Sequence, residues 1–119
     1  MDNIEVIVIE WLQSVADAAY PVSGDKPKTP PATYILVDRT GGDREAMVLD
    51  RAEILIEVYN KDSRLAASNE ANRLADLVPA LKAYHENITR ADVNSVVNLP
   101  DLIGQYQRYQ VYCDIYFRR

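Results

Sequence analysis

The chain has 119 residues, of which 48% are hydrophobic and 26% charged, a composition typical of one globular domain with a single core. Its net charge of −5 argues against free DNA or RNA as a ligand, because nucleic-acid binding normally draws on clustered lysine and arginine. No apolar run approaches the roughly 20 residues of a membrane span, and the acidic start MDNIEVIVIEW is unlike a signal peptide, so we expect one domain over 1–119, made in a cytoplasm.

The first expected element is a helix over residues 3–19. Asp2 and Glu5 have capping-box spacing, and apolar residues then recur at steps of three and four: Ile4, Val8, Trp11, Val15 and Ala19. The β-branched run 6–9 would suit a strand equally well. Residues 20–33 hold four prolines and few core-forming side chains. They predict an irregular proline-rich loop that is functional or reaches a neighbouring subunit.

Two strands joined by a glycine turn are expected next. The run 33–40 is rich in Tyr, Ile and Val, and Gly41-Gly42 is expected to turn the chain into a longer strand over 48–59. In the longer strand Ala52, Ile54, Ile56 and Val58 alternate with polar residues, the period-two pattern of a half-buried strand. At about 3.3 Å per residue it would cover roughly 40 Å and cross the whole domain.

A second helix is expected from Asp62 to about Leu81. Its apolar positions recur at helical spacing and are rich in alanine, which suggests close packing against a sheet. Pro79 should kink or end this helix, because proline removes a backbone donor.

The last part of the chain predicts a second hairpin. A short strand over 91–97 is followed by a turn at Pro100 and Gly104 and by a clear amphipathic strand over 109–117. The order helix, hairpin, helix, hairpin predicts an α+β fold. We expect a four-stranded antiparallel sheet with two helices packed on one face.

Signatures of catalysis and metal binding are scarce. The single thiol is Cys113 and the single imidazole is His85, too few for a metal site of the usual His and Cys type. Cys113 is expected on the core face of its strand, where a buried inert thiol is the favoured interpretation. A lone cysteine also agrees with a reducing compartment. The sequence therefore predicts no catalytic residue, no cofactor and no metal, and hence no enzyme.

Tyrosine is overrepresented, with eight residues against one phenylalanine. Four crowd the final segment: Tyr106, Tyr109, Tyr112 and Tyr116. By the alternation of that strand, Tyr112 and Tyr116 face away from the helices. Phenol rings suit an interface that is wet in the free subunit, but ordinary cross-strand pairing explains them equally well.

Three consecutive stretches carry a family resemblance: RTGGDREAMVLDRAEILIEVYNKD, the alanine-rich helix SRLAASNEANRLADLVPAL and the C-terminal VVNLPDLIGQYQRYQVYCDIYFRR. From about residue 33 onward the chain resembles the tail terminator proteins of long-tailed bacteriophages, particularly those infecting actinobacteria. The matching positions surround the two hairpins: Arg39, Gly41, Gly42, Leu49, Asp50, Leu99, Pro100, Asp101, Arg108 and Tyr109. None of them is a catalytic signature, so the resemblance rests on order and spacing.

The resemblance implies a small α+β subunit of a ring, commonly a hexamer, at the head-proximal end of the phage tail tube. In the virion, such a ring stops tube polymerisation and presents the head-tail joining surface. Its partners would be its own copies, the tail tube protein and the head-tail connector protein, with DNA only passing through the lumen. By analogy the interface candidates are Arg39, Asp43 and Arg44 at the first hairpin tip, and Asp101, Arg108 and Tyr112 near the second.

Other functions remain open on the sequence. A second neck component, such as a head-completion or connector subunit, would also be a small ring-forming protein. A dimeric bacterial regulator or ligand-binding α+β module is a different class. An enzyme would require a deep pocket lined by Glu53, Glu57 and His85.

Overall fold

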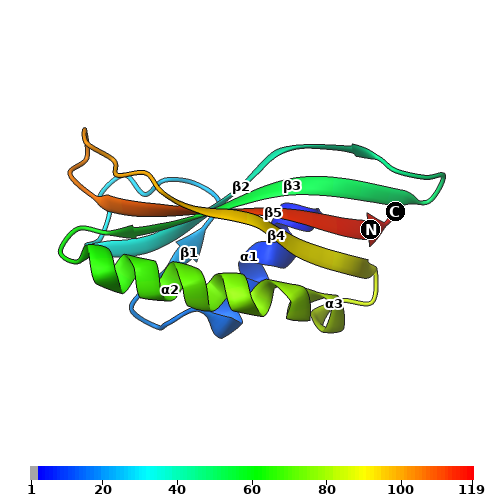
Figure 1. The fold of residues 1–119 in the computed structure, drawn as a ribbon, viewed down its shortest axis with the longest axis horizontal. Helices are drawn as coiled ribbons and strands as arrows, with labels where there is room; N and C mark the ends of the chain where they lie inside the picture. The colour runs from blue at the N-terminus through cyan, green and yellow to red at the C-terminus, as the bar shows by residue number, and fades with distance from the viewer. Residues whose placement is uncertain (1–2) are drawn as a thin grey trace.

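The computed structural model describes residues 3–119 and has an α+β fold in two layers (Figure 1). Its elements are α1 (Ile4–Val15), β1 (Val22–Ser23), β2 (Thr33–Arg44), β3 (Leu49–Asn60), α2 (Arg64–Leu77), the 3-10 turn η1 (Val78–Ala80), α3 (Leu81–Tyr84), β4 (Ile88–Asn98) and β5 (Gln107–Arg118). One layer is a sheet in the order β1-β2-β3-β5-β4, and α1 and α2 cover one of its faces. The molecule measures 45 × 24 × 23 Å, because the four long strands run along one axis.

The sheet has one strand more than the four-stranded antiparallel sheet that the sequence predicts. β2, β3, β5 and β4 pair antiparallel with their neighbours, as expected. The fifth strand, β1, pairs parallel to β2 through Val22 opposite Ile35 and Ser23 opposite Leu36. It lies inside the proline-rich segment that was expected to be irregular throughout. A strand of two residues is too short to leave a period-two pattern, so the sequence carries no signal for it.

Gly41-Gly42 does not form the hairpin turn, and that prediction was wrong. Both glycines lie within β2, where the register against β3 shifts between Arg39 and Gly41, and the chain turns at residues 45–48 instead. Gly42 has a φ of +138°, and a Cβ there would lie 2.1 Å from the Arg51 carbonyl oxygen. Glycine is therefore required by an irregularity inside the strand, not by the tip.

Helix α1 is shorter than the predicted range of 3–19. The side chain of Asn3 caps it by accepting a hydrogen bond from the Glu5 amide at 2.9 Å. Asp2, the expected cap, lies outside the described residues. The helix ends after Val15, because Ala16 is already extended with ψ of 152°.

Helix α2 begins close to the predicted start and ends at the proline. Ser63 caps it by accepting from the Ala66 amide at 3.0 Å. Pro79 sits in η1, which separates α2 from the short α3, so the predicted break is confirmed. No helix in residues 3–119 is both long and apolar enough to cross a membrane.

The main core lies between the helices and the sheet. The alternation predicted for β3 and β5 is confirmed: every second residue is buried in the main core on the helix side, among them Ile54 and Ile115. From α1 and α2, Leu12 and Leu74 reach full burial against them. The helix side of the sheet is therefore filled by α1 and α2, whereas no helix in the described part of the chain covers the other side.

Buried Glu70 joins the chain after α1 to α2. Its carboxylate accepts from the Asp17 amide at 2.8 Å and from Arg73 at 2.8 Å. A buried carboxylate is tolerated when it is paired and hydrogen-bonded, and this one fixes the start of the proline-rich segment beside the second helix.

Candidate interaction surfaces

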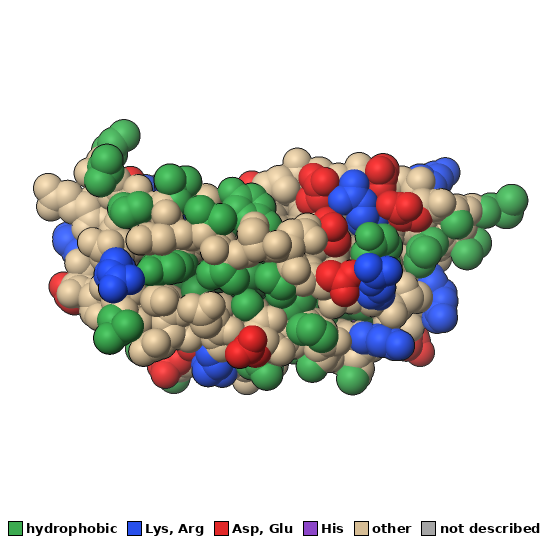
Figure 2. Space-filling model, viewed as in Figure 1, with side chains coloured by type: hydrophobic (Ala, Val, Ile, Leu, Met, Phe, Trp, Pro, Cys, Tyr) green, Lys and Arg blue, Asp and Glu red, His purple; other side chains and the backbone are tan. Residues whose placement is uncertain are grey.

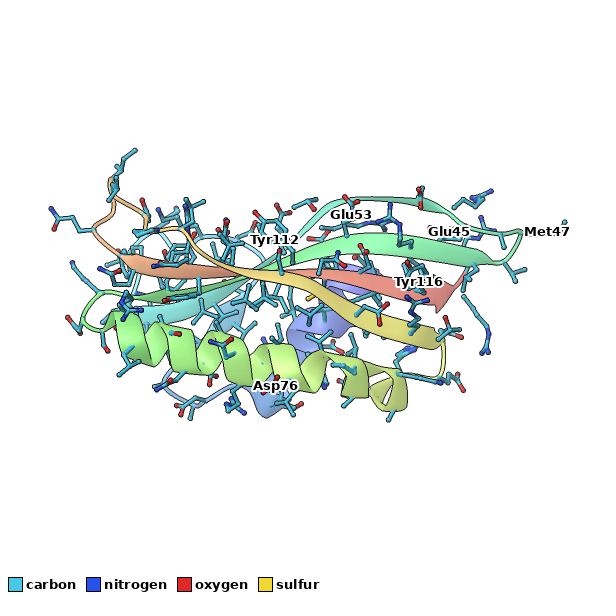
Figure 3. All side chains as sticks on the ribbon, viewed as in Figure 1. Glu45, Met47, Glu53, Asp76, Tyr112 and Tyr116 are labelled. Atoms are coloured by element: carbon cyan, nitrogen blue, oxygen red, sulfur yellow. The ribbon has the colours of Figure 1, made fainter. Side chains whose placement is uncertain are left out.

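The face of the sheet turned away from the helices is called the open face here. It includes Glu53, Tyr112 and Tyr116, which lie across the sheet from Asp76 on α2 (Figure 3). The prediction that Tyr112 and Tyr116 face away from the helices is confirmed by the register of β5. Both tyrosines are half-buried. The Tyr116 ring is partly covered by the Arg90 guanidinium, which lies 5.0 Å from the ring centre.

Three tyrosines form a second, smaller core at one end of the open face. The Tyr34 and Tyr59 rings stack with centroids 4.3 Å apart, and Tyr106 meets both edge-on at 5.5 and 5.9 Å. All three are buried. Burial raises the pKa of the Tyr34 hydroxyl, which has no hydrogen-bond partner within the described part of the chain, so this phenol stays neutral. The cluster joins β2, β3 and the segment before β5 at this end of the open face.

The tyrosine core anchors two loops. Tyr106 closes the β4–β5 connection, and its hydroxyl donates to the Pro31 carbonyl oxygen at 2.7 Å. This bond joins the proline-rich segment to the connection between β4 and β5, although the two are far apart in sequence. Two irregular segments are therefore held in place at the same end of the molecule.

The β4–β5 connection exposes the aliphatic side chains of Leu102 and Ile103, and we call these two residues the apolar turn. Asp101 and Tyr106 exchange backbone hydrogen bonds of 3.0 and 3.1 Å, and the Asp101 carboxylate accepts from the Gly104 amide at 3.1 Å. The closed base leaves Leu102 84% and Ile103 99% exposed. Two adjacent exposed aliphatic side chains make this turn a candidate contact site.

A second apolar tip lies at the opposite end of the molecule. Met47 and Val48, which we call the hairpin tip, are 91% and 61% exposed at the end of the β2–β3 hairpin, and Figure 3 shows Met47 at the extreme end. The Arg119 guanidinium donates a hydrogen bond to the Ala46 carbonyl oxygen at 3.0 Å, next to this tip. In the space-filling view, hydrophobic atoms project at both ends of the long axis (Figure 2).

Beside the hairpin, one arginine holds four carboxylates on the open face. Arg51 lies 3.2 Å from Asp43, 3.2 Å from Glu45, 3.0 Å from Glu53 and 3.0 Å from Asp114. Its hydrogen bonds lower the pKa of the Asp43 carboxyl, and the acids in turn raise the pKa of Arg51. With four anions around one cation, this part of the open face is acidic.

The Arg51 cluster predicts a distinctive dependence of stability on pH. Because the folded-state pKa of Asp43 is lowered, its stabilising effect is present above the unfolded-state pKa and is lost as the pH falls through the folded-state value. In Arg51→Met the uncompensated acids repel one another at pH 7 and are neutralised by acid. The urea midpoint of the variant should therefore lie well below that of the wild type at pH 7 and approach it toward pH 3.

The matched control for that prediction is Arg44→Met on the same hairpin. Arg44 lies 3.8 Å from one carboxylate, Asp50, and its side chain is 72% exposed, so its loss should change stability little at any pH. A constant difference between Arg51→Met and the wild type from pH 7 to pH 3 would contradict the role assigned to the cluster.

Five of the six predicted interface residues lie toward opposite ends of the molecule and Tyr112 lies between them, so the structure does not bring the six into one site. At the hairpin end Asp43 is held by Arg51, and Arg44 is loosely paired and mostly exposed. Arg39, also there, donates to the Gly41 carbonyl oxygen at 3.1 Å and lies over the Phe117 ring at 5.9 Å. Asp43 and Arg44 belong to β2 and precede the tip in which they were expected.

At the other end of the molecule, Asp101 and Arg108 make contacts within the chain. Arg108 donates to the Leu99 carbonyl oxygen at 2.9 Å and lies 3.5 Å from Glu57. Asp101 closes the apolar turn. Tyr112 lies between the ends and donates to Gln110 at 3.0 Å. These contacts engage the predicted residues within the fold, whereas the neighbouring Leu102 and Ile103 side chains remain exposed.

The sequence reasoning missed both apolar tips. Ile103 and Leu102 stand between Pro100 and Gly104, and Met47 and Val48 stand in what proves to be the hairpin turn. Turns are normally polar, so large aliphatic residues in a turn are a readable signal for a contact. At the first hairpin this signal is hidden, because the sequence pattern places the turn at Gly41-Gly42 and Met47 and Val48 then read as the start of the next strand.

Two of the hollows on the surface formed by residues 3–119 lie near residues considered above. A hollow of about 370 Å³ on the open face is bordered by Glu53 together with Tyr112 and Cys113, and one of about 420 Å³ lies at the start of α1. Glu57 and His85 line neither of them. Within residues 3–119, no three His, Cys, Asp or Glu side chains are grouped so as to hold a metal ion.

The Cys113 thiol is expected not to react with thiol reagents while the protein is folded. It is 2% exposed, and burial raises the pKa of its thiol to about 12. Such a pKa leaves roughly a thousandth of the thiolate that an ordinary cysteine holds at neutral pH. Labelling by a thiol-specific disulfide reagent at pH 7 should therefore require unfolding, and rapid labelling without urea would contradict this burial.

Comparison of the sequence with protein-family models gives no match, and comparison with curated proteins gives none either.

Proposed function

We propose that this chain is a structural virion protein of the tail terminator type. In this proposal its copies form a ring, a hexamer by the resemblance, on the head-proximal end of the phage tail tube. The ring ends tube polymerisation and offers its other side to the head-tail connector protein.

The observation that best supports this proposal is the presence of two different exposed apolar tips at opposite ends of one elongated subunit. A closed ring of head-to-tail contacts needs two complementary but different surfaces on each copy. The apolar turn and the hairpin tip differ in sequence and in local structure, and they lie too far apart to cover each other within one subunit. A dimer with a twofold axis needs only one self-complementary patch, so it explains this arrangement less well.

The acidic part of the open face also fits the proposal. If this face lines the lumen, the carboxylates around Arg51 repel the DNA phosphates and let DNA pass without binding. Replacing Glu45 and Glu53 by lysine should then slow DNA ejection. An unchanged rate of ejection in particles that carry these variants would remove this part of the proposal.

The proposal is tested by adding the purified protein to tail tubes made from the tube protein of the same phage or prophage. Negative-stain images should show a ring at one end of each tube, and tubes capped in this way should stop growing. Binding to portal-side proteins but not to tubes would indicate another neck component. A stable dimer that binds a small molecule and ignores tubes would indicate a regulator.

A further inference from the structure

We propose that the apolar turn of one subunit docks on the hairpin tip of the next copy, and that this contact joins the ring. The inference rests on the proposed function and specifies the subunit contact that it requires. The partner is a second copy of this chain, because each subunit carries both halves of the contact at opposite ends.

The contact would remove the most exposed apolar side chains of the molecule from water. Ile103, Met47 and Leu102 are the three most exposed large hydrophobic residues in the described part of the chain, and Val48 lies beside Met47. Isolated exposed apolar residues are ordinary, as Leu65 on α2 illustrates. Adjacent pairs at the two extremes of the chain's long axis are not isolated, and a head-to-tail contact covers both pairs at once.

A charged group beside each tip can pair with one beside the other: the hairpin tip has Arg44, whose side chain is 72% exposed, and the apolar turn has Asp101. Arg44 and Arg119 flank the hairpin tip, and both guanidinium groups share a single carboxylate, Asp50, at 3.8 and 3.4 Å. At the base of the apolar turn lies the Asp101 carboxylate, whose only hydrogen bond recorded within residues 3–119 is the one from the Gly104 amide. Docking the turn against the hairpin brings this carboxylate toward the loosely paired Arg44, because the hairpin carboxylates Asp43 and Glu45 are already bound by Arg51. The opposite pairing, turn against turn, would bring two Asp101 carboxylates together.

Both halves of the contact are ordered before they meet. The turn is closed by backbone bonds and by the tyrosine core beneath it. At the hairpin, the Glu45 and Ala46 amides both donate to the Leu49 carbonyl oxygen, and Arg119 holds Ala46. Ordering a loop on binding costs free energy, so tips that are already rigid bind more tightly for the same area.

Pairing between sheet edges is a weaker alternative. β4 is an edge strand, but its register shifts between Ile88 and Arg90 and again between Val93 and Ser95. The uncovered half of β2 carries the irregularity at Gly42. Irregularities of this kind twist an edge away from further pairing, which leaves the side chains of the tips as the better contact.

Cross-linking with single cysteines tests the contact directly. Met47→Cys and Ile103→Cys are prepared separately, and a short bismaleimide is added to each alone and to their mixture, at the concentration or on the tail tubes where rings form. Buried Cys113 does not compete, because it is 2% exposed. We expect linked pairs in the mixture but not in either variant alone. The double variant should give a ladder that stops at the ring size.

The outcomes separate this inference from the proposed function. Rings that form without cross-links in the mixture would overturn the inference and leave the proposed function standing. Linked pairs in one variant alone would indicate a twofold contact and overturn it too. The absence of both rings and links would overturn both proposals.

A second measurement uses affinity. Ile103→Ser should weaken ring assembly by about tenfold or more, because the contact would lose the burial of a large aliphatic side chain. The matched control is Leu65→Ser, which replaces an exposed aliphatic residue on α2, in the helix layer rather than in either tip, and should leave assembly unchanged. Equal assembly by both variants would contradict the contact.

Discussion

Replacing Leu74 by alanine is expected to lower the free energy of unfolding by about 3 to 5 kcal/mol. Leu74 is fully buried on the face of α2 that packs against β5, β3 and β4. Ala67 and Ala71 on the same face bring the helix close to the sheet and are themselves buried. Because the close-packed backbones cannot easily collapse into the vacated space, the variant bears the cost of a cavity as well as lost burial.

The matched control for Leu74 is Leu65→Ala on the same helix. Leu65 is 62% exposed, so its truncation should change stability by no more than about 0.5 kcal/mol. Urea unfolding followed by circular dichroism measures both variants at once. Similar losses for the two would contradict the assignment of the buried face of α2.

Replacing Gly42 by valine is expected to cost at least about 2 kcal/mol, or to unpair the distal half of the hairpin. The φ of +138° is unfavourable for any residue with a Cβ, and that atom would meet the Arg51 carbonyl oxygen at 2.1 Å. Since the obstructing oxygen belongs to the backbone of the partner strand, a change of side-chain rotamer cannot relieve the clash. The hairpin must move, and the tip with Met47 moves with it.

Hydrogen exchange distinguishes the two results for Gly42→Val. Loss of protection confined to the distal parts of β2 and β3 would show local opening, whereas a uniform loss would show global destabilisation. Gly24→Val is the control, because a Cβ at Gly24 would meet the flexible end of Ile9 at 3.2 Å. Full protection and unchanged stability in Gly42→Val would contradict the geometry of this strand. If the hairpin opens, ring assembly should fail as well.

The regular part of this fold could be predicted because its residues follow simple periods. In β3 and β5 the alternation of buried and polar residues decided both the strands and the face that each side chain takes. Ser63 and Pro79 marked the ends of α2 by their local chemistry. These signals are local, and the structure follows them to within a few residues.

The candidate contacts depend on distant residues, and the sequence pattern could not locate them. Tyr34, Tyr59 and Tyr106 come from three parts of the chain, and each reads as an ordinary strand or turn residue until the sheet brings them together. The register shift between Arg39 and Gly41 depends on the partner strand, so the sequence of β2 alone could not predict it. Both glycines lie within the strand, and the hairpin turn at residues 45–48 exposes Met47. The two hairpins were therefore identified, while the side chains displayed at their ends were not.

The mass of the particle in solution decides whether the chain builds a ring. Light scattering is recorded at low and high protein concentration, and the same samples are imaged in negative stain with and without tail tubes. We expect the mass to rise with concentration or on tubes to one fixed multiple of the subunit mass, with closed rings that have a central hole. A monomer or dimer at every concentration, with no ring on added tubes, would contradict it.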